Sequence, residues 1–409
     1  MDFSLEYTKE QEEFAREVRE WLDQNYSKDM DRPREPRKMS HEVWQKRREL
    51  GRKLGEKGWL FPDYPRQYGG GGLEADLGSV LSQELAQRGL GMPPYYDIAF
   101  LAAPGILACG TEEQKKRFLP PMLKGEVITW QLFTEPEAGT DEANQQTNAL
   151  RHVREKDHFT VSGSKIFVGA WTNQQPPDQF WLLTRSDLEA PRHQNLAMFI
   201  APANLPGITI VPLDLFVPEV FGVISGPTID YADGDKNSVF FDEVKIHESY
   251  LIGGEKDGWS VTNATLDVEH GGGGVRVPHE NTIVEKFLAQ CKSNPNVAKR
   301  LRENPQLLES VVDIYIGAQI GRLWGLRFAG GIGAHYQGPQ VLLHSKMYGA
   351  RIIADMAKVL GPYTLTDDDE WGLDEGIFEV GQRGGICLAP GGTPEATKII
   401  MSRLLGIGR

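Results

Sequence analysis

The spacing of apolar residues changes twice along the chain, and this change constrains the fold more than any other sequence feature. Apolar residues first recur with the period of a helix, then alternate in short runs separated by Gly, Pro and Asp, as in antiparallel strands. Helical spacing then returns, most clearly in QLLESVVDIYIGAQIGRLWGLRFAG. The sequence therefore predicts an α+β fold, with a helical domain over 1–118, an antiparallel β domain over 119–246 and a second helical domain over 247–409.

Local signals indicate where helices begin and where loops lie. Thr8 with Gln11, and Thr111 with Gln114, fit the capping box, in which side chain and backbone satisfy each other's free donors. The stretch FPDYPRQYGGGG is expected to form a rigid, glycine-ended loop. The glycine-rich stretch DEWGLDEGIFEVGQRGGICLAPGGTPEATK has little periodicity, so we expect a long loop before a final helix.

Charge and cysteine content exclude several classes of function. Lys and Arg number 44 against 57 Asp and Glu, so the net charge of −13 would repel nucleic acid and anionic lipid. The three cysteines, Cys109, Cys291 and Cys387, show neither a disulfide framework nor zinc-ligand spacing. We find no signal-peptide pattern and no apolar window as long as a membrane span, so the sequence predicts a cytoplasmic protein. The charge favours a small molecule as the ligand, and the cysteine spacing predicts no metal site.

Two stretches of the β region combine small residues, hydroxyls and aromatics at the start and end of strands. They are WQLFTEPEAGTD at 130–141 and GSKIFVGAW at 163–171. Such a surface could accept a planar ring with polar edges, although each stretch alone is also compatible with an ordinary turn.

Together with FDEVKIHESYLIGGEKDGW at 241–259 and GGTPEATKIIMSRLLG at 391–406, these stretches resemble the acyl-CoA dehydrogenase family. The resemblance runs through nearly the whole chain, in the family's order and spacing. It implies a helical N-terminal domain, a barrel-like middle domain and a helical C-terminal bundle, with FAD held between the last two. By position, it also implies flavin-lining residues, with Thr134 and Thr140 as hydrogen-bonding candidates and Thr393 on the adenine side: Gln131, Phe133, Thr134, Thr140, Phe167, Gly169 and Thr393.

The chain departs from the family at several of these positions. Phe167 and Gly169 stand where the family commonly has Trp and Thr, so an aromatic ring is kept while a hydroxyl is lost. The usual catalytic base lies in a YEGT-like stretch, and here Gly391 occupies its place. Gly391 cannot accept a proton, but its backbone N–H can still donate a hydrogen bond to the thioester oxygen, where negative charge develops.

A minority of the family carries the base on a helix of the C-terminal domain, in a stretch resembling LDxER. LDVEH matches this stretch at Leu266, Asp267 and Glu269, so Glu269 is the candidate base that removes the proton α to the thioester. His270 replaces the family's arginine, and its role stays open. The four glycines at 271–274 either widen the acyl pocket for a bulky group, such as a sterol side chain or ring, or simply end the helix.

Two further departures fall on residues that reach a neighbouring subunit in the family. The family's RxxFG, whose arginine binds the partner's flavin pyrophosphate, is replaced by SNPNV at 293–297. The family's QxxGG is replaced by KVLGP, with Lys358 at the glutamine position. The resemblance is therefore to bacterial members that form heterotetramers, although a homotetramer stays open.

These observations predict FAD-dependent α,β-dehydrogenation of a bulky or branched acyl-CoA, with Glu269 as base and an electron-transferring flavoprotein as acceptor. A non-catalytic subunit that completes the FAD site of a paralogous partner is an alternative, motivated by Gly391 and the altered interface motifs. A flavin monooxygenase on the same fold is a weaker alternative, because it would need no base for an α-proton.

Overall fold

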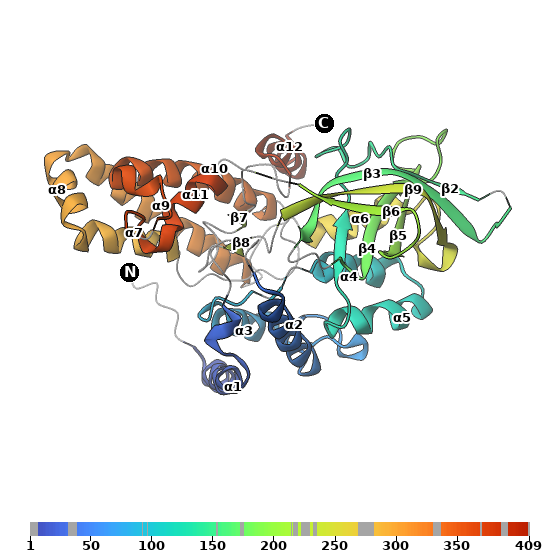
Figure 1. Ribbon diagram of the computed structural model, residues 1–409, viewed down its shortest axis with the longest axis horizontal. Helices are drawn as coiled ribbons and strands as arrows, with labels where there is room; N and C mark the ends of the chain where they lie inside the picture. Colours follow the sequence, from blue (N-terminus) through green and yellow to red (C-terminus); the bar gives the residue numbers. More distant parts are fainter. Residues whose placement is uncertain are drawn as a thin grey trace.

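The structure is a computed structural model of the 409-residue chain. It describes residues 7–31, 39–91, 93–95, 97–152, 154–171, 176–213, 215, 220–221, 230–231, 235–268, 282–329, 337–368, 370–385 and 392–407. Helices precede and follow a central sheet, so the predicted α+β architecture is confirmed (Figure 1).

The N-terminal region is helical and packs along one side of the sheet (Figure 1). Its apolar residues form one core with the facing side chains of the sheet, including Trp181, Met198 and Ile200. Both predicted capping boxes are present, at Thr8 and at Thr111. The elements are α1 Lys9–Asn25, η1 Lys28–Met30, α2 His41–Glu56, η3 Arg66–Tyr68, α3 Ala75–Ala86, α4 Ala99–Cys109 and α5 Glu112–Leu123.

The central sheet has the strand order β10-β5-β4-β2-β3-β9-β6, with β1 added against β4. Its pairs are antiparallel except β1–β4 and β2–β4, which are parallel, so the predicted antiparallel domain is in fact mixed at this point. The strands are β1 Thr129–Leu132, β2 Asn148–Arg151, β3 His158–Trp171, β4 Gln179–Arg185, β5 Leu196–Pro202, β6 Ile208–Pro212, β9 Asp235–His247 and β10 Leu251–Ile252. A separate pair joins β7 Val220–Phe221 to β8 Asp230–Tyr231, and η4 Glu248–Tyr250 precedes β10.

The C-terminal helices form a core of their own, which includes Phe287, Ile314 and Met356 and lies to the left of the sheet in Figure 1. The elements after the sheet are α6 Gly258–Asp267, α7 Thr282–Ser293, α8 Pro295–Glu303, α9 Gln306–Ala329, α10 Gln337–Leu360, η6 Gly361–Thr364, η7 Asp374–Gly376, α11 Ile377–Gly385 and α12 Pro394–Leu404. None of the described helices is long and apolar enough to cross a membrane.

Two features differ from the sequence-based expectation. The stretch predicted as a long loop contains α11, whose Phe378 is buried in the C-terminal core, so this part of the prediction is wrong. Helix α6 packs against α4 and β5, and its Val261 belongs to the core of the N-terminal helices. The described part of α6 therefore joins the N-terminal helices to the sheet, away from the core of the C-terminal helices.

Candidate active site

The structure brings the two predicted stretches of the β region together. The loop that follows β1 contacts β3, because Ile166 N–H donates to the carbonyl of Thr134 at 3.0 Å and Lys165 Nζ donates to the carbonyl of Phe133 at 3.1 Å. Strand β3 is irregular here, with register shifts against β9 between 165 and 171. The loop and the irregular end of β3 together form the candidate site.

The predicted flavin-lining residues differ in exposure. Phe133 is buried in the core beside Trp181, so its side chain packs inside the protein. Gln131 and Thr134 are half-buried, and Thr140 is exposed. The hydroxyls of Thr134 and Thr140 have no hydrogen-bond partner within the described ranges, which leaves both available to a ligand.

Phe167 and Gly169 both have backbone conformations that L side chains rarely adopt. Phe167 has φ +57° and a ring that is 53% exposed, an unusual combination for a large apolar side chain. Gly169 has φ +64°, and a Cβ at this position would lie 2.2 Å from the ring of Trp130. Only glycine fits against this ring at this backbone conformation.

A buried polar network, which no sequence motif indicates, lies directly behind this surface. Lys165 is fully buried, and its Nζ donates to Glu135 Oε1 at 2.7 Å and to Gln145 Oε1. Burial lowers the pKa of Lys165 to about 8, against the opposing effect of the Glu135 carboxylate. The alternating pattern of a strand does not predict such burial of a lysine, although Lys165 and Glu135 each stand in one of the two quoted stretches.

The entrance to β1 is fixed by a buried carboxyl group. Asp97 Oδ1 accepts hydrogen bonds from the N–H of Ala99, at the start of α4, and of Thr129, at the start of β1, both at 3.0 Å. Burial raises the pKa of Asp97 to about 7, although the two backbone donors and the Arg48 guanidinium lower it. Asp97 therefore connects the N-terminal helices to the strand that leads into the candidate site.

The described part of the LDVEH stretch belongs to the last turn of α6. Trp181 Nε1 donates to Thr265 Oγ1 at 3.1 Å, which fixes α6 on β4, and Asp267 is exposed. Val268, the residue before the candidate base, is partly buried against the core that the N-terminal helices share with the sheet. Glu269, His270 and the glycines at 271–274 lie outside the described residues.

The segment around the other predicted catalytic position is described only from Gly392 onward, so Gly391 also lies outside the described residues. Gly392 has φ +87°, and its carbonyl accepts a hydrogen bond from Lys346 Nζ of α10. Thr393 is the N-cap of α12, and its hydroxyl accepts from Ala396 N–H at 3.3 Å. The Thr393 hydroxyl thus has a structural role in this structure.

The two altered interface motifs lie side by side at one end of the C-terminal helices. Asn294 caps α8 with its side chain and Pro295 is the first residue of that helix, so SNPNV forms a helix start. Arg300 donates from Nε and Nη2 to the carbonyl of Lys358, at 3.2 and 2.9 Å. Lys358 Nζ pairs with Asp355 Oδ1 at 2.7 Å.

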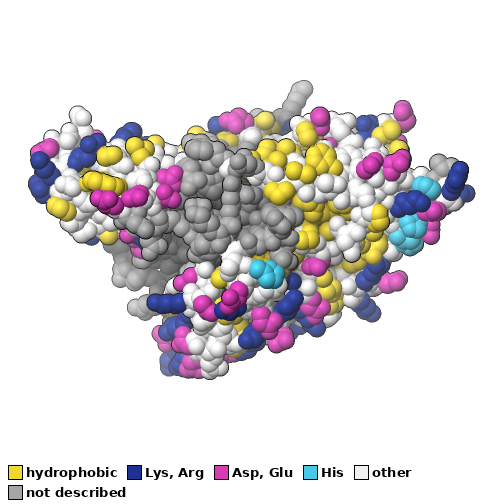
Figure 2. All heavy atoms as spheres, in the orientation of Figure 1, with side chains coloured by type: hydrophobic (Ala, Val, Ile, Leu, Met, Phe, Trp, Pro, Cys, Tyr) yellow, Lys and Arg dark blue, Asp and Glu magenta, His cyan; other side chains and the backbone are white. Residues whose placement is uncertain are grey.

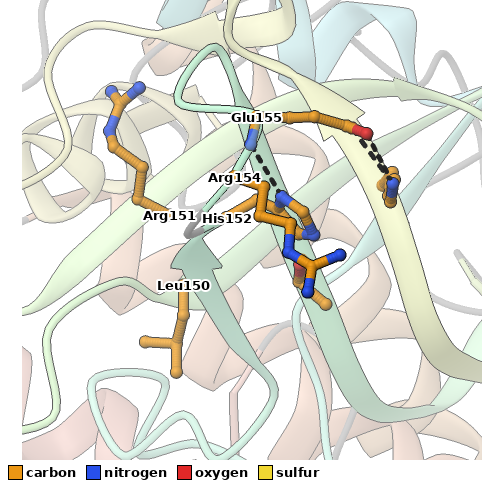
Figure 3. Close-up of a pocket in the computed structure, with 7 residues that line it drawn as sticks. Leu150, Arg151, His152, Arg154 and Glu155 are labelled. Atoms are coloured by element: carbon orange, nitrogen blue, oxygen red, sulfur yellow. Dashed lines mark hydrogen bonds and ion pairs between the residues drawn. The ribbon is translucent and has the colours of Figure 1, made fainter.

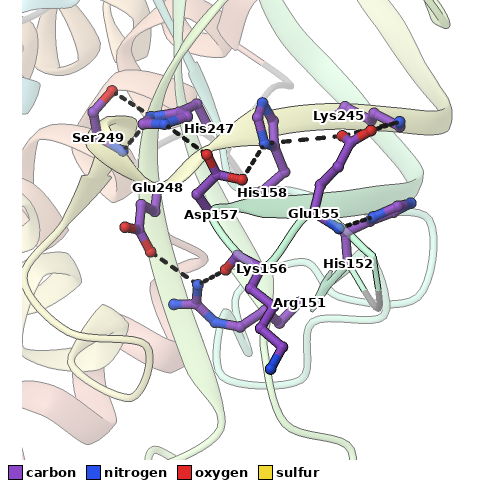
Figure 4. A network of polar contacts seen from close by, with 10 residues as sticks. All are labelled: Arg151, His152, Glu155, Lys156, Asp157, His158, Lys245, His247, Glu248 and Ser249. Carbon is purple, nitrogen blue, oxygen red and sulfur yellow. Dashed lines mark hydrogen bonds and ion pairs between the residues drawn. The ribbon is translucent and has the colours of Figure 1, made fainter.

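A second charged cluster lies at the opposite end of β3, where β2 turns into β3. Arg151 pairs with Glu248 at 2.9 Å, and Glu155 pairs with Lys245 at 2.9 Å (Figure 4). A pocket in this surface is lined by Leu150, Arg151, His152, Arg154, Glu155, Thr160 and Lys245 (Figure 3). At about 3.3 Å per residue, His158 and Phe167 are roughly 30 Å apart along β3, so this cluster is separate from the candidate site.

No group of three or more His, Cys, Asp or Glu side chains within the described residues could hold a metal ion. The candidate site instead offers an exposed aromatic ring, closely packed backbone and two hydroxyls that have no hydrogen-bond partner in the described part of the chain. Such a surface suits a flat organic ligand with polar edges.

The chain is similar to acyl-CoA dehydrogenases in sequence and in fold. The family model "Acyl-CoA dehydrogenase, N-terminal domain" matches residues 8–126. Acyl-CoA dehydrogenase FadE34 of Mycobacterium tuberculosis is 29% identical over 359 residues, which cover 87% of this chain and 46% of that protein. The chain spans 46% to 61% of the length of the first three curated relatives it matches.

Solved structures show the same fold over the full chain. The Tcur3481-Tcur3483 steroid ACAD matches with a TM-score of 0.77 and 24% identity, covering 100% of both chains. The ChsE4-ChsE5 complex from Mycobacterium tuberculosis matches with a TM-score of 0.76 and 23% identity, again over 100% of both chains. The N-terminal region therefore matches the acyl-CoA dehydrogenase family, and the whole chain shares the fold of these solved structures, in agreement with the sequence motifs.

Proposed function

We propose that the chain is an FAD-dependent acyl-CoA dehydrogenase that oxidises a bulky or branched acyl thioester between its α and β carbons. The observation that carries this proposal is the surface formed by the Thr134 loop and the end of β3. There the Thr134 hydroxyl has no hydrogen-bond partner within the described residues, and the neighbouring strand holds the Phe167 ring exposed at a positive φ. The backbone strain at Phe167, about 1–3 kcal/mol, fits a residue placed for a ligand.

The residues present fit FAD at this surface. Phe167 would cover one face of the flavin ring, and Thr134 and Thr140 would hydrogen-bond its polar edge. Gly169 lets the backbone beneath this surface pack directly on the buried Trp130 ring. When bound, FAD supplies a hydride acceptor for the β carbon, and the remaining steps fall to side chains and backbone of this chain.

We assign proton removal to Glu269, which takes the α-proton while the backbone N–H of Gly391 donates to the thioester oxygen. A donor at that oxygen contributes about 3 kcal/mol where negative charge develops. The described end of α6 supports this assignment, because the chain leaves α6 at Val268 beside the core that α4 shares with the sheet. A base following this helix would be near the junction of the N-terminal helices with the sheet.

A bulky acyl group is supported by the glycines at 271–274 and by the relatives. Four residues without side chains next to the base would leave room for a ring or branched chain. The Tcur3481-Tcur3483 protein of the same fold is named a steroid ACAD. An electron-transferring flavoprotein is the proposed acceptor of the electrons, and we place the reaction in the cytoplasm because the three cysteines stand far apart.

The test of this function replaces Glu269 with Gln, which keeps shape and hydrogen bonding but removes proton affinity. We expect flavin reduction by a steroid side-chain acyl-CoA, followed by stopped-flow absorbance, to fall by several orders of magnitude while FAD stays bound. The matched control is Asp267→Asn, because Asp267 is an exposed carboxylate two residues away. A Glu269→Gln protein that is reduced at the normal rate would contradict the assignment.

We also propose that the enzyme assembles with a paralogous subunit into a heterotetramer. Helix α9 exposes an apolar face between residues 308 and 323, and Figure 2 shows hydrophobic side chains over both the helical and the sheet parts of the surface. The residues recur at helical spacing and are each 40% to 54% exposed: Leu308, Val312, Tyr315, Ile316, Ile320 and Leu323.

Native mass spectrometry tests this assembly. The chain produced alone is expected to be poor in flavin, and its co-expression with the paralogue should give an α2β2 complex with fewer flavins than chains. A homotetramer of this chain with one FAD per subunit and full activity would contradict the heterotetramer. A complex that binds FAD but retains its activity in the Glu269→Gln variant would instead favour a non-catalytic role for this chain.

A further inference from the structure

Lys165 is a buried cation whose three donors all find acceptors. Its Nζ donates to Glu135 Oε1 at 2.7 Å, to the Phe133 carbonyl at 3.1 Å and to Gln145 Oε1, and none of the lysine is exposed. An ammonium group has three N–H donors, so its hydrogen bonding is complete. Burying a charge is costly unless it is paired and hydrogen-bonded, so this arrangement needs a reason beyond filling space.

The same network closes the loop that follows β1. Glu135 stands near the start of this loop, and its carboxylate accepts the N–H groups of Gln146 at 2.6 Å and Thr147 at 3.1 Å near its end. Thr147 Oγ1 then donates to the carbonyl of Ser164, next to Lys165. Both ends of the segment 133–147 are therefore held against β3 at the position of Lys165.

Thr134 is fixed from both sides by this arrangement. Lys165 Nζ holds the carbonyl before it, and the N–H of Ile166 holds its own carbonyl at 3.0 Å. Because the peptide group is planar, fixing the Phe133 carbonyl also sets the direction of the Thr134 N–H. Two consecutive residues of β3 thus set the peptide planes that flank Thr134, and the next residue is Phe167.

We propose that Lys165 is a positioning residue for the flavin site, which closes the segment 133–147 onto β3 and orients Thr134 before any ligand binds. This inference rests on the proposed function for the identity of the ligand. The geometry of the loop is a property of the chain itself and can be tested without the ligand. Preorganised hydrogen-bonding groups bind more tightly because the ligand need not order them.

The test compares three variants. Lys165→Met leaves the Glu135 carboxylate buried without its cation, so this protein is expected to unfold more easily. Lys165→Met/Glu135→Gln removes both charges, and the oxygen of the introduced amide can still accept one backbone N–H, so folding should recover. The matched control is Lys245→Met/Glu155→Gln, which removes an exposed pair between β9 and the turn before β3, with side chains 50% and 47% exposed (Figure 4).

Two measurements separate positioning from simple charge neutralisation. In the Lys165→Met/Glu135→Gln protein without ligand, amide hydrogen exchange over 133–147 should be about tenfold faster, the equilibrium equivalent of one net hydrogen bond. Its FAD dissociation constant should rise by about the same factor or more, with loss of fine structure in the bound-flavin absorption band. The control should match the wild type in both measurements.

A double variant with wild-type exchange and wild-type FAD affinity would overturn the inference, because Lys165 would then serve only to neutralise Glu135. A wild-type protein that binds no FAD, alone or with its partner, would contradict the proposed function. In that case the exchange of 133–147 still decides whether Lys165 orders the loop, with unchanged exchange refuting it and accelerated exchange supporting it.

Discussion

The buried carboxyl of Asp97 makes the stability of the protein depend on pH in a predictable direction. Its pKa is about 7 in the folded protein because of burial, against an ordinary value of 3.8. Between these values the folded protein binds more protons than the unfolded chain, so the free energy of unfolding decreases as the pH rises. At 1.36 kcal/mol per pKa unit, the shift of about three units corresponds to about 4 kcal/mol in total.

The substitution Asp97→Asn isolates this effect. Asparagine Oδ1 can still accept the N–H groups of Ala99 and Thr129, while its side chain does not titrate. The NH2 group of the asparagine takes the place of Asp97 Oδ2, which has no hydrogen-bond partner within the described residues. Burying this unpaired NH2 group destabilises the variant by an amount that does not vary with pH. The informative quantity is therefore the change with pH in the stability difference between the two proteins.

Urea unfolding followed by tryptophan fluorescence between pH 6 and pH 8.5 measures this difference above the isoelectric point of about 5.3. With pKa values of 3.8 and about 7, we expect the variant to gain about 1 kcal/mol relative to the wild type over this interval. Equal m-values for the two proteins would show that the same transition is compared. Stability curves that run parallel from pH 6 to pH 8.5 would refute a protonated Asp97 in the folded protein.

Three further outcomes are expected at the candidate site. Gly169→Ala should lower the free energy of unfolding by about 3 kcal/mol, because a Cβ at this positive φ would lie 2.2 Å from the Trp130 ring. Gly139→Ala is the control and should leave the free energy of unfolding unchanged, because open space surrounds that position. Phe167→Ala should weaken FAD binding, measured by fluorescence titration, with little change in urea unfolding because the ring is exposed. Replacing one glycine of 271–274 with Leu should reduce kcat/KM for bulky acyl-CoAs more than for short straight ones, and equal losses would contradict a widened pocket.

The sequence predicted those elements whose signals are local. A capping box needs only two residues three positions apart, and both boxes form with hydrogen bonds of 3.0 and 3.2 Å. The strands and the long helix α9 followed from the period of their apolar residues. Helix α11 was missed because its glycines weaken the helical signal, while burial of Phe378 against the C-terminal core stabilises the helix in the fold.

The candidate site was predictable only in part, because its supporting groups meet across long stretches of chain. Lys165 lies in an alternating strand, where a lysine is normally expected to face solvent. Its partners Glu135 and Gln145 stand 30 and 20 residues earlier, so only the folded structure shows that the three form one buried network. Similarly, the sequence shows only that residue 169 has no hydroxyl, and the contact with Trp130 that requires glycine there is visible only in the structure.

The two altered motifs of the C-terminal helices bear on which subunit of the proposed assembly supplies the cation for the flavin pyrophosphate. In the family that the chain resembles, the arginine of RxxFG reaches the flavin pyrophosphate of a neighbouring subunit. Here Arg300 of α8 is engaged by the Lys358 carbonyl of the same chain, and Asn296 donates to the Tyr363 hydroxyl at 2.8 Å. These contacts hold α8 against the end of α10 and against η6. Phosphates held at an interface need cationic or hydrogen-bonding partners, so under the proposed assembly the paralogous subunit must provide the cation for FAD bound here.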